Sequence, residues 1–151
     1  KVKLIRKGSH TVHDLKIHFV TCTKYRKKIL TGDIALRCRE IIRQICEANE
    51  VQIIKGNLSS DHIHLFLSIN PDLPISKLAQ LIKGKVSIKL FQEFPKLRKQ
   101  YWGCHLWARG YFCATSRRCS GILAAGNITD EIILDYITNQ EEGIQLDEKD
   151  F

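Results

Sequence analysis

The stretch Asp61-His62-Ile63-His64-Leu65-Phe66-Leu67-Ser68 places an apolar side chain at every second position from Ile63 onward. Successive side chains of a β-strand point to opposite faces, so this pattern predicts a strand over residues 61–69 whose odd-numbered residues enter a core. His62 and His64 then lie together on the other face, about 6.5 Å apart along the strand. Two imidazoles at that spacing can share one metal ion. They can equally be two polar residues on a solvated face, and both interpretations stay open at this point.

The segments on either side of this strand predict the rest of a small sheet. Apolar and β-branched residues predict further strands over residues 15–21, 51–58 and 107–115. Ser59 and Ser60 form a link short enough to join two of these strands as a hairpin. Apolar residues at helical spacing predict helices over residues 32–49, 75–93 and 129–142.

These elements follow the order strand–helix–strand–strand–helix–strand, with one more helix near the C-terminal end. The order matches the ferredoxin-like split βαβ arrangement, in which an antiparallel sheet carries two helices on one face. We therefore expect an α+β fold in a single domain over residues 1–151. Its expected parts are a core over about 14–116, a linker over about 117–128, a helix over about 129–142 and an acidic tail over 143–151.

Charge is spread unevenly along the chain, whose formal net charge is +8. Residues 129–151 hold eight of the 16 acidic residues and one basic residue, which leaves 23 basic and eight acidic residues in the first 128. Such an excess suits a polyanionic partner such as nucleic acid, although a solvated basic surface explains it as well. No apolar run reaches the roughly 18–20 residues that span a bilayer, so we expect a soluble, cytoplasmic protein without a membrane partner.

The six cysteines contain no C-x-x-C pair, which gives no support to a zinc-ribbon or thioredoxin-like site. Cys38 and Cys46 fall on the apolar face of an expected helix. We expect reduced, buried thiols, and the sequence leaves a disulfide open.

Tyr136 and Gln140 are four residues apart on the last expected helix, so their side chains are neighbours. A tyrosine hydroxyl is a weak nucleophile at its usual pKa of about 10 and needs a polarised electrophile or a proton acceptor nearby. A metal ion on a phosphate supplies the first, and the amide oxygen of Gln140 suits Mg²⁺ or Mn²⁺ as a ligand. Taken alone, a helical tyrosine more often packs on a neighbouring element.

Four stretches, in this order, resemble the small single-strand DNA transposases of insertion sequences, which belong to the His-hydrophobic-His superfamily and use one catalytic tyrosine. The stretches are residues 19–30, 61–68, 106–112 and 136–140. Each is short, and the specificity comes from their joint occurrence across residues 15–140. The connection over residues 115–127 departs from the family, in which a short glycine turn usually leads into the catalytic helix.

The resemblance implies a metal-dependent tyrosine transposase that cleaves and rejoins single-stranded DNA with hairpin ends. Tyr136 would be the nucleophile, forming a 5′-phosphotyrosine and releasing a 3′ hydroxyl. His62, His64 and Gln140 would be the ligands of Mg²⁺ or Mn²⁺, and no nucleotide cofactor would be needed. The family works as a homodimer, and whether Tyr136 serves its own subunit or the partner stays open.

Two groups of basic residues are candidates for DNA phosphate contacts, one after the first strand and one on the second long helix. With one aromatic residue that can stack on a base, they are Lys24, Tyr25, Arg26, Lys27, Lys28, Lys83, Lys85 and Lys89. Core packing is the expectation for Trp107 and Tyr111. The alternative function is a non-catalytic single-stranded nucleic-acid-binding module of the same fold, which would need exposed aromatics where this chain has its histidine pair.

Overall fold

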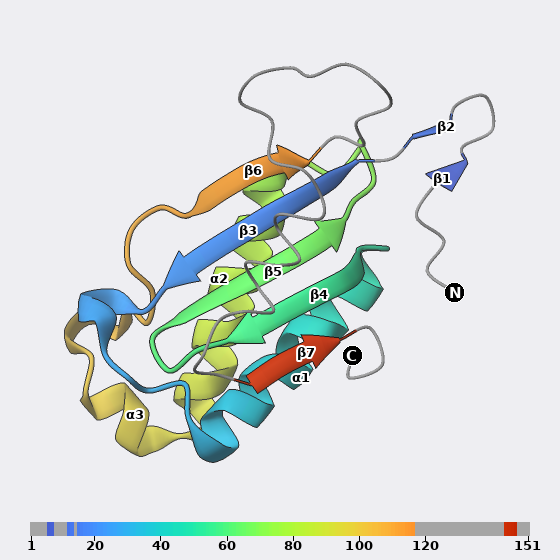
Figure 1. The fold of residues 1–151 in the computed structure, drawn as a ribbon. Helices are drawn as coiled ribbons and strands as arrows, with labels where there is room; N and C mark the ends of the chain where they lie inside the picture. The colour runs from blue at the N-terminus through green and yellow to red at the C-terminus, as the bar shows by residue number, and fades with distance from the viewer. Residues whose placement is uncertain (1–5, 8–11, 14, 117–143, 148–151) are drawn as a thin grey trace.

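The computed structural model describes residues 6–7, 12–13, 15–116 and 144–147. Its main body is a five-stranded antiparallel sheet in the order β6-β3-β5-β4-β7 (Figure 1). The strands are β3 (Lys16–Cys22), β4 (Gln52–Leu58), β5 (His62–Ser68), β6 (Phe112–Ser116) and β7 (Ile144–Asp147). A separate two-stranded sheet pairs β1 (Arg6–Lys7) with β2 (Val12–His13).

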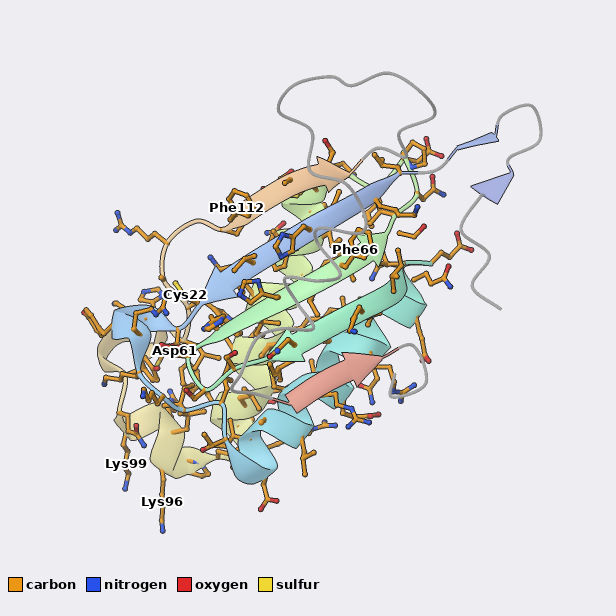
Figure 2. All side chains as sticks on the ribbon, in the orientation of Figure 1. Cys22, Asp61, Phe66, Lys96, Lys99 and Phe112 are labelled. Carbon is orange, nitrogen blue, oxygen red and sulfur yellow. The ribbon has the colours of Figure 1, made fainter. Side chains whose placement is uncertain are left out.

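Two long helices, α1 (Gly32–Ala48) and α2 (Ile75–Glu93), cover one face of the large sheet (Figure 1). Their apolar residues, among them Ile41 and Ile82, join the odd-numbered residues of β3 and β5 in one buried core. A short helix, α3 (Pro95–Lys99), begins right after α2. Pro95 occupies the first turn of α3, where a missing backbone N–H does no harm, and α2 ends before it. Lys96 and Lys99 project from α3 away from the sheet (Figure 2).

The ferredoxin-like fold prediction is confirmed. The first and third of its four strands, β3 and β5, lie side by side at the centre, with β6 and β4 on their outer sides. The link Ser59-Ser60 joins β4 to β5 as expected, and the Ser59 amide donates to the His62 carbonyl over 2.9 Å. The histidine strand therefore lies in the middle of the sheet, where its register is held by neighbours on both edges.

The prediction of a fourth strand over residues 107–115 is wrong at its start, because β6 begins only at Phe112. Gly110 adopts a left-handed backbone with φ of +74°, which interrupts extended pairing. Trp107 makes only an isolated bridge with Thr23, and its buried indole nitrogen donates to the Lys83 carbonyl of α2 over 3.0 Å. Core packing is thus confirmed for Trp107 but wrong for Tyr111, whose side chain is 41% exposed.

The expected acidic tail contains a strand that the sequence did not predict. Residues Ile144–Asp147 form β7 and pair with β4 at one edge of the sheet, Ile144 opposite Leu58 and Asp147 opposite Lys55. A four-residue strand among acidic residues has too short an alternation to stand out. The expected linker, residues 117–128, and the expected helix, residues 129–142, lie outside the described residues.

Five cysteines fall in the described residues, and all five are free thiols. Burial raises the pKa of the Cys38 and Cys46 thiols to about 12, so both stay protonated and act as small apolar groups. In the same part of the chain, no helix combines the length and the apolar character needed to cross a membrane.

Candidate active site

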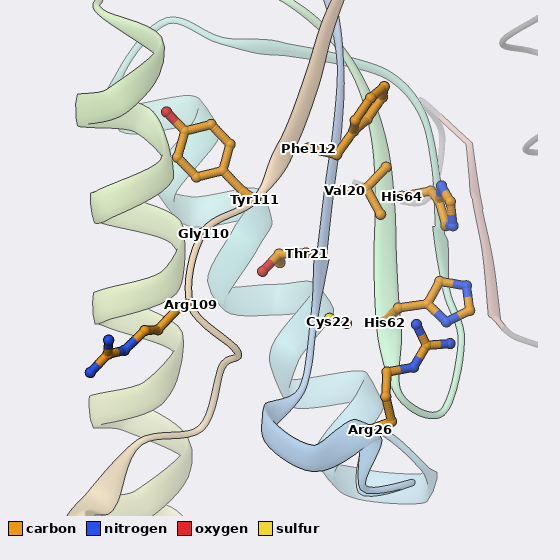
Figure 3. Close-up of a pocket in the computed structure, with 10 residues that line it drawn as sticks. All are labelled: Val20, Thr21, Cys22, Arg26, His62, His64, Arg109, Gly110, Tyr111 and Phe112. Carbon is orange, nitrogen blue, oxygen red and sulfur yellow. The ribbon is translucent and has the colours of Figure 1, made fainter.

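His62 and His64 lie on the face of β5 opposite the helices (Figure 3). The alternation that the sequence predicts places them there, because Ile63 and Leu65 are fully buried on the helix-covered face. The two imidazole rings are 4.8 Å apart between centroids and nearly perpendicular, at 80°. Two imidazoles close enough to share one metal ion are thus side by side on an anchored strand.

Asp61 holds the ring of His62 in place. Its Oδ1 lies 2.6 Å from His62 Nδ1, and its Oδ2 accepts a hydrogen bond from Arg26 Nε over 3.0 Å. Burial opposes ionisation of Asp61, but these two hydrogen bonds outweigh it and lower the pKa of the carboxyl group. A carboxylate behind a ligand histidine fixes which ring nitrogen faces outward.

His18 is a third histidine at the site, and its spacing along the sequence gives no sign of this role. Its Nε2 lies 3.2 Å from Nδ1 of His64, and the two rings stack at 5.4 Å with an angle of 22°. The contact follows from register: Val20 of β3 pairs with His64, so His18, two residues along, is the diagonal neighbour on the same face. Only the register between β3 and β5 places His18 beside His64, and this register could not be predicted from the sequence alone.

The imidazoles of His64 and His18 are neutral at physiological pH. Burial, followed by electrostatic interactions with His62, His18 and Arg26, lowers the pKa of His64 to about 4. Burial also lowers the pKa of His18. A neutral imidazole can coordinate a metal ion, whereas a protonated one cannot, so the lowered pKa of His64 favours the form that could bind metal.

An open hollow of about 670 Å³ lies beside the histidines and is bounded by basic and aromatic side chains (Figure 3). Arg26 lines it next to His62, and Arg109 and Phe112 line it from the β6 side. Phe112 pairs with Val20, so it shares the face of His64, and it is 54% exposed (Figure 2). Exposed aromatic and cationic groups around a histidine pair suit a single-stranded nucleic acid.

The two imidazoles alone do not complete a metal site. Among the residues that the structure describes, no group of three or more His, Cys, Asp or Glu side chains could hold a metal ion. Two imidazole nitrogens do suit a transition metal such as Mn²⁺ once oxygen ligands are added. Gln140, the expected third ligand, and Tyr136, the expected nucleophile, lie outside the described residues.

The basic residues predicted to contact DNA divide into two groups. Residues 24–28 follow β3 at the end of the sheet that holds Asp61, and Tyr25 is 74% exposed with the Lys24 ammonium 5.1 Å from its ring. Lys83, Lys85 and Lys89 instead lie on α2, across the sheet from the histidines. Lys83 donates to the carbonyls of Ala108 and Gly110, over 2.9 and 2.7 Å, and so holds the connection before β6.

Comparison with known proteins identifies the family. The family model described as "Transposase IS200 like" matches residues 11–140, most of the chain and all four stretches on which the resemblance rests. The chain belongs to the IS200-like transposase family.

Curated relatives agree with this assignment. The transposase for insertion sequence element IS200 of Salmonella typhimurium is 32% identical over 141 residues, 93% of this chain and 86% of that protein. The ISDra2 transposase TnpA of Deinococcus radiodurans is 32% identical over 111 residues, 74% of this transposase and 79% of that one.

Solved structures share the fold. A transposase from Deinococcus radiodurans has a TM-score of 0.69 and 28% identity, covering 91% of this chain and 99% of that one. A REP-associated tyrosine transposase bound to a REP hairpin has a TM-score of 0.53 and 14% identity, covering 70% and 57%. At 14% identity, the similarity to this second structure shows a shared fold only.

Proposed function

We propose that this transposase cleaves and rejoins single-stranded DNA at insertion-sequence ends through a 5′-phosphotyrosine on Tyr136. The family assignment supports DNA cleavage and strand transfer in general. The observation that carries the finer proposal is the pair His62 and His64, set on one face of β5 with each Nδ1 in contact with another side chain. Metal-binding histidines characteristically have such partners.

The reaction proposed for Tyr136 consumes no reactant other than the DNA. Its hydroxyl oxygen attacks the scissile phosphorus, the bond from phosphorus to the 3′ oxygen breaks, and that oxygen takes up a proton to leave as a 3′ hydroxyl. The hydroxyl proton of Tyr136 passes to solvent. Rejoining is the reverse, with a 3′ hydroxyl attacking the phosphotyrosine.

We assign the metal ion, Mg²⁺ or Mn²⁺, to His62 and His64 together with Gln140. When bound, it supplies Lewis-acid polarisation of the scissile phosphate. The protein's own contribution is to hold both imidazoles side by side on a strand whose other face is buried in the core. Arg26, beside His62 in the hollow, supplies positive charge where a phosphodiester backbone would run.

The DNA is proposed to be single-stranded with hairpin ends. The structural neighbour bound to a REP hairpin has the same fold, which makes a hairpin a reasonable substrate to test. On this chain, Phe112 lines the hollow and Tyr25 precedes Arg26 in the turn after β3; both are exposed aromatics that could stack on unpaired bases.

The test is a search for a covalent protein–DNA adduct. The protein is incubated with labelled single-stranded hairpin DNA and Mn²⁺, and the adduct is mapped by mass spectrometry. We expect the adduct on Tyr136, its loss in Tyr136→Phe with DNA binding retained, and its loss in His64→Ala. A non-catalytic binding module would give no adduct in any variant, and an adduct that persists in Tyr136→Phe would refute the nucleophile assignment.

A mixing experiment tests the proposed homodimer and shows which subunit Tyr136 serves. Tyr136→Phe and His64→Ala are each expected to be inactive. If the tyrosine of one subunit completes the histidine site of the other, a mixture of the two variants regains cleavage, because a mixed dimer holds one intact site. If Tyr136 serves its own subunit, the mixture stays inactive.

A further inference from the structure

Each histidine of the pair has a different side chain at its Nδ1. His62 Nδ1 meets the Asp61 carboxylate at 2.6 Å, and His64 Nδ1 meets His18 Nε2 at 3.2 Å. The two partners come from different places, Asp61 from the turn before β5 and His18 from the middle of β3. In both histidines the contacted atom is Nδ1, so the two contacts can have the same effect on the two rings.

The chemistry of these contacts sets the ring tautomers. A carboxylate only accepts hydrogen bonds, so His62 must carry its proton on Nδ1. If His18 likewise accepts at Nε2, His64 carries its proton on Nδ1. An imidazole protonated on Nδ1 coordinates a metal through Nε2, because only that nitrogen then has a lone pair to give.

We propose that Asp61 and His18 are positioning residues that hold His62 and His64 as Nδ1–H tautomers, so that both rings present Nε2 to one metal ion. This inference rests on the proposed function, since it takes His62 and His64 as metal ligands. Neither partner touches the metal or the DNA in this role.

The position of His18 is set by the fold. Its neighbours Ile17 and Phe19 are fully buried in the core beneath the sheet, which fixes the backbone of β3 at this point. On the outer face the His18 ring is itself 6% exposed and meets the Phe112 ring edge-on at 6.1 Å. A ring held on both sides can orient the ring of His64 beside it.

The position of Asp61 is set by the basic turn. Arg26 donates to its second carboxylate oxygen, and the Thr23 amide donates to its backbone carbonyl over 2.8 Å. The turn that follows β3 thus holds the Asp61 carboxylate in place, and this carboxylate in turn orients the ring of His62. The two ligand rings are oriented by two separate supports, one a charged group and one a neutral ring.

Two substitutions at His18 separate hydrogen bonding from packing. His18→Phe keeps a ring of similar shape and removes the acceptor. His18→Gln places an amide oxygen close to the position of Nε2, so it restores an acceptor while losing the aromatic ring. If His18 only packs, His18→Phe is the milder change. If His18 orients His64 through a hydrogen bond, His18→Gln is the milder change.

The first measurement is the affinity of the full chain for Mn²⁺ alone, read from free Mn²⁺ by electron paramagnetic resonance. We expect His18→Phe to bind Mn²⁺ about 10- to 100-fold more weakly than the wild type. His18→Gln should fall within about threefold of it, because the acceptor is restored. Asp61→Ala should weaken binding like His18→Phe, and Asp61→Asn less, because its amide oxygen still accepts.

The second measurement reads the tautomers in metal-free protein by ¹⁵N–¹H correlation spectra of the imidazoles. We expect Nδ1–H for His64 in the wild type and in His18→Gln, and a shift toward Nε2–H in His18→Phe. A wild-type His64 with its proton on Nε2, or equal Mn²⁺ affinity in His18→Phe and the wild type, would overturn the inference. Failure of the wild type itself to bind Mn²⁺ would instead refute the metal site of the proposed function, on which the inference rests.

Discussion

Acid should destabilise the metal-free protein through His64. The perturbation is a fall in pH from about 7.5 to about 4.5 in the presence of a chelator. An unfolded histidine has a pKa of about 6.5, whereas burial and nearby positive charge lower that of folded His64 to about 4. Below pH 6.5 the unfolded chain therefore binds a proton at this position that the folded protein does not.

The sign and size of the effect follow from that difference. The contribution is fully present above pH 6.5 and is lost as the pH falls toward 4, because protonation then favours the unfolded chain. Each pH unit between the two pKa values corresponds to about 1.4 kcal/mol, so the complete loss is about 3 kcal/mol. His64 is 5% exposed, so solvent screens this effect little.

The assay is urea unfolding at a series of pH values, comparing the wild type with His64→Gln. Between pH 7.5 and 4.5 the free energy of unfolding of the wild type should fall by about 2–3 kcal/mol more than that of the variant. His105→Gln, at an exposed histidine, is the matched control and should follow the wild type. Parallel pH profiles for wild type and His64→Gln would refute the reasoning that His64 is held neutral by its surroundings.

Substitutions at four further residues test the assignments made to them. Lys83→Met should lower the free energy of unfolding by about 1–2 kcal/mol, because two backbone carbonyls lose a charged donor. The salt dependence of DNA binding, measured by fluorescence anisotropy, should stay unchanged. A weaker dependence of DNA affinity on salt concentration in the variant would instead show that Lys83 contacts a phosphate. Tyr25→Ala should weaken binding of single-stranded DNA by about 1–3 kcal/mol if its exposed ring stacks on a base, and Tyr25→Phe should not. Phe112→Ala should show a loss of similar size without a change in thermal stability, in contrast to a core residue. Leu65→Ala, behind the histidines, should cost about 2–5 kcal/mol in urea unfolding, and a smaller loss would mean that the core closes around the cavity.

The fold could be predicted from the sequence because local patterns were strong where elements are long. Apolar spacing on α1 and α2, and alternation on β5, depend only on which faces are buried. The start of β6 could not be predicted, because Gly110 and the indole contact of Trp107 with α2 override the strand propensity of the residues between them. β7 was missed because pairing with β4 is a long-range contact.

The candidate site was predictable in part for the same reason. The shared face of His62 and His64 follows from their spacing on one strand, which is local information. His18 and Arg26 reach the site only through the register of β3 against β5 and through the turn after β3, both of which are tertiary features. The roles of Tyr136 and Gln140 stay predictions, since both residues lie outside the described part of the chain.

The burial of Ile63, Leu65 and Leu67 on the helix-covered face of the histidine strand links correct folding to the arrangement of the histidines. A slip of β5 by one residue would exchange its two faces, turning both imidazoles toward the helices and the apolar row to the opposite face. Such a slip would be costly for the core before it had any effect on the site. A misregistered copy with a malformed histidine pair is therefore also an unstable copy, and protein quality control can remove it without any test of its activity.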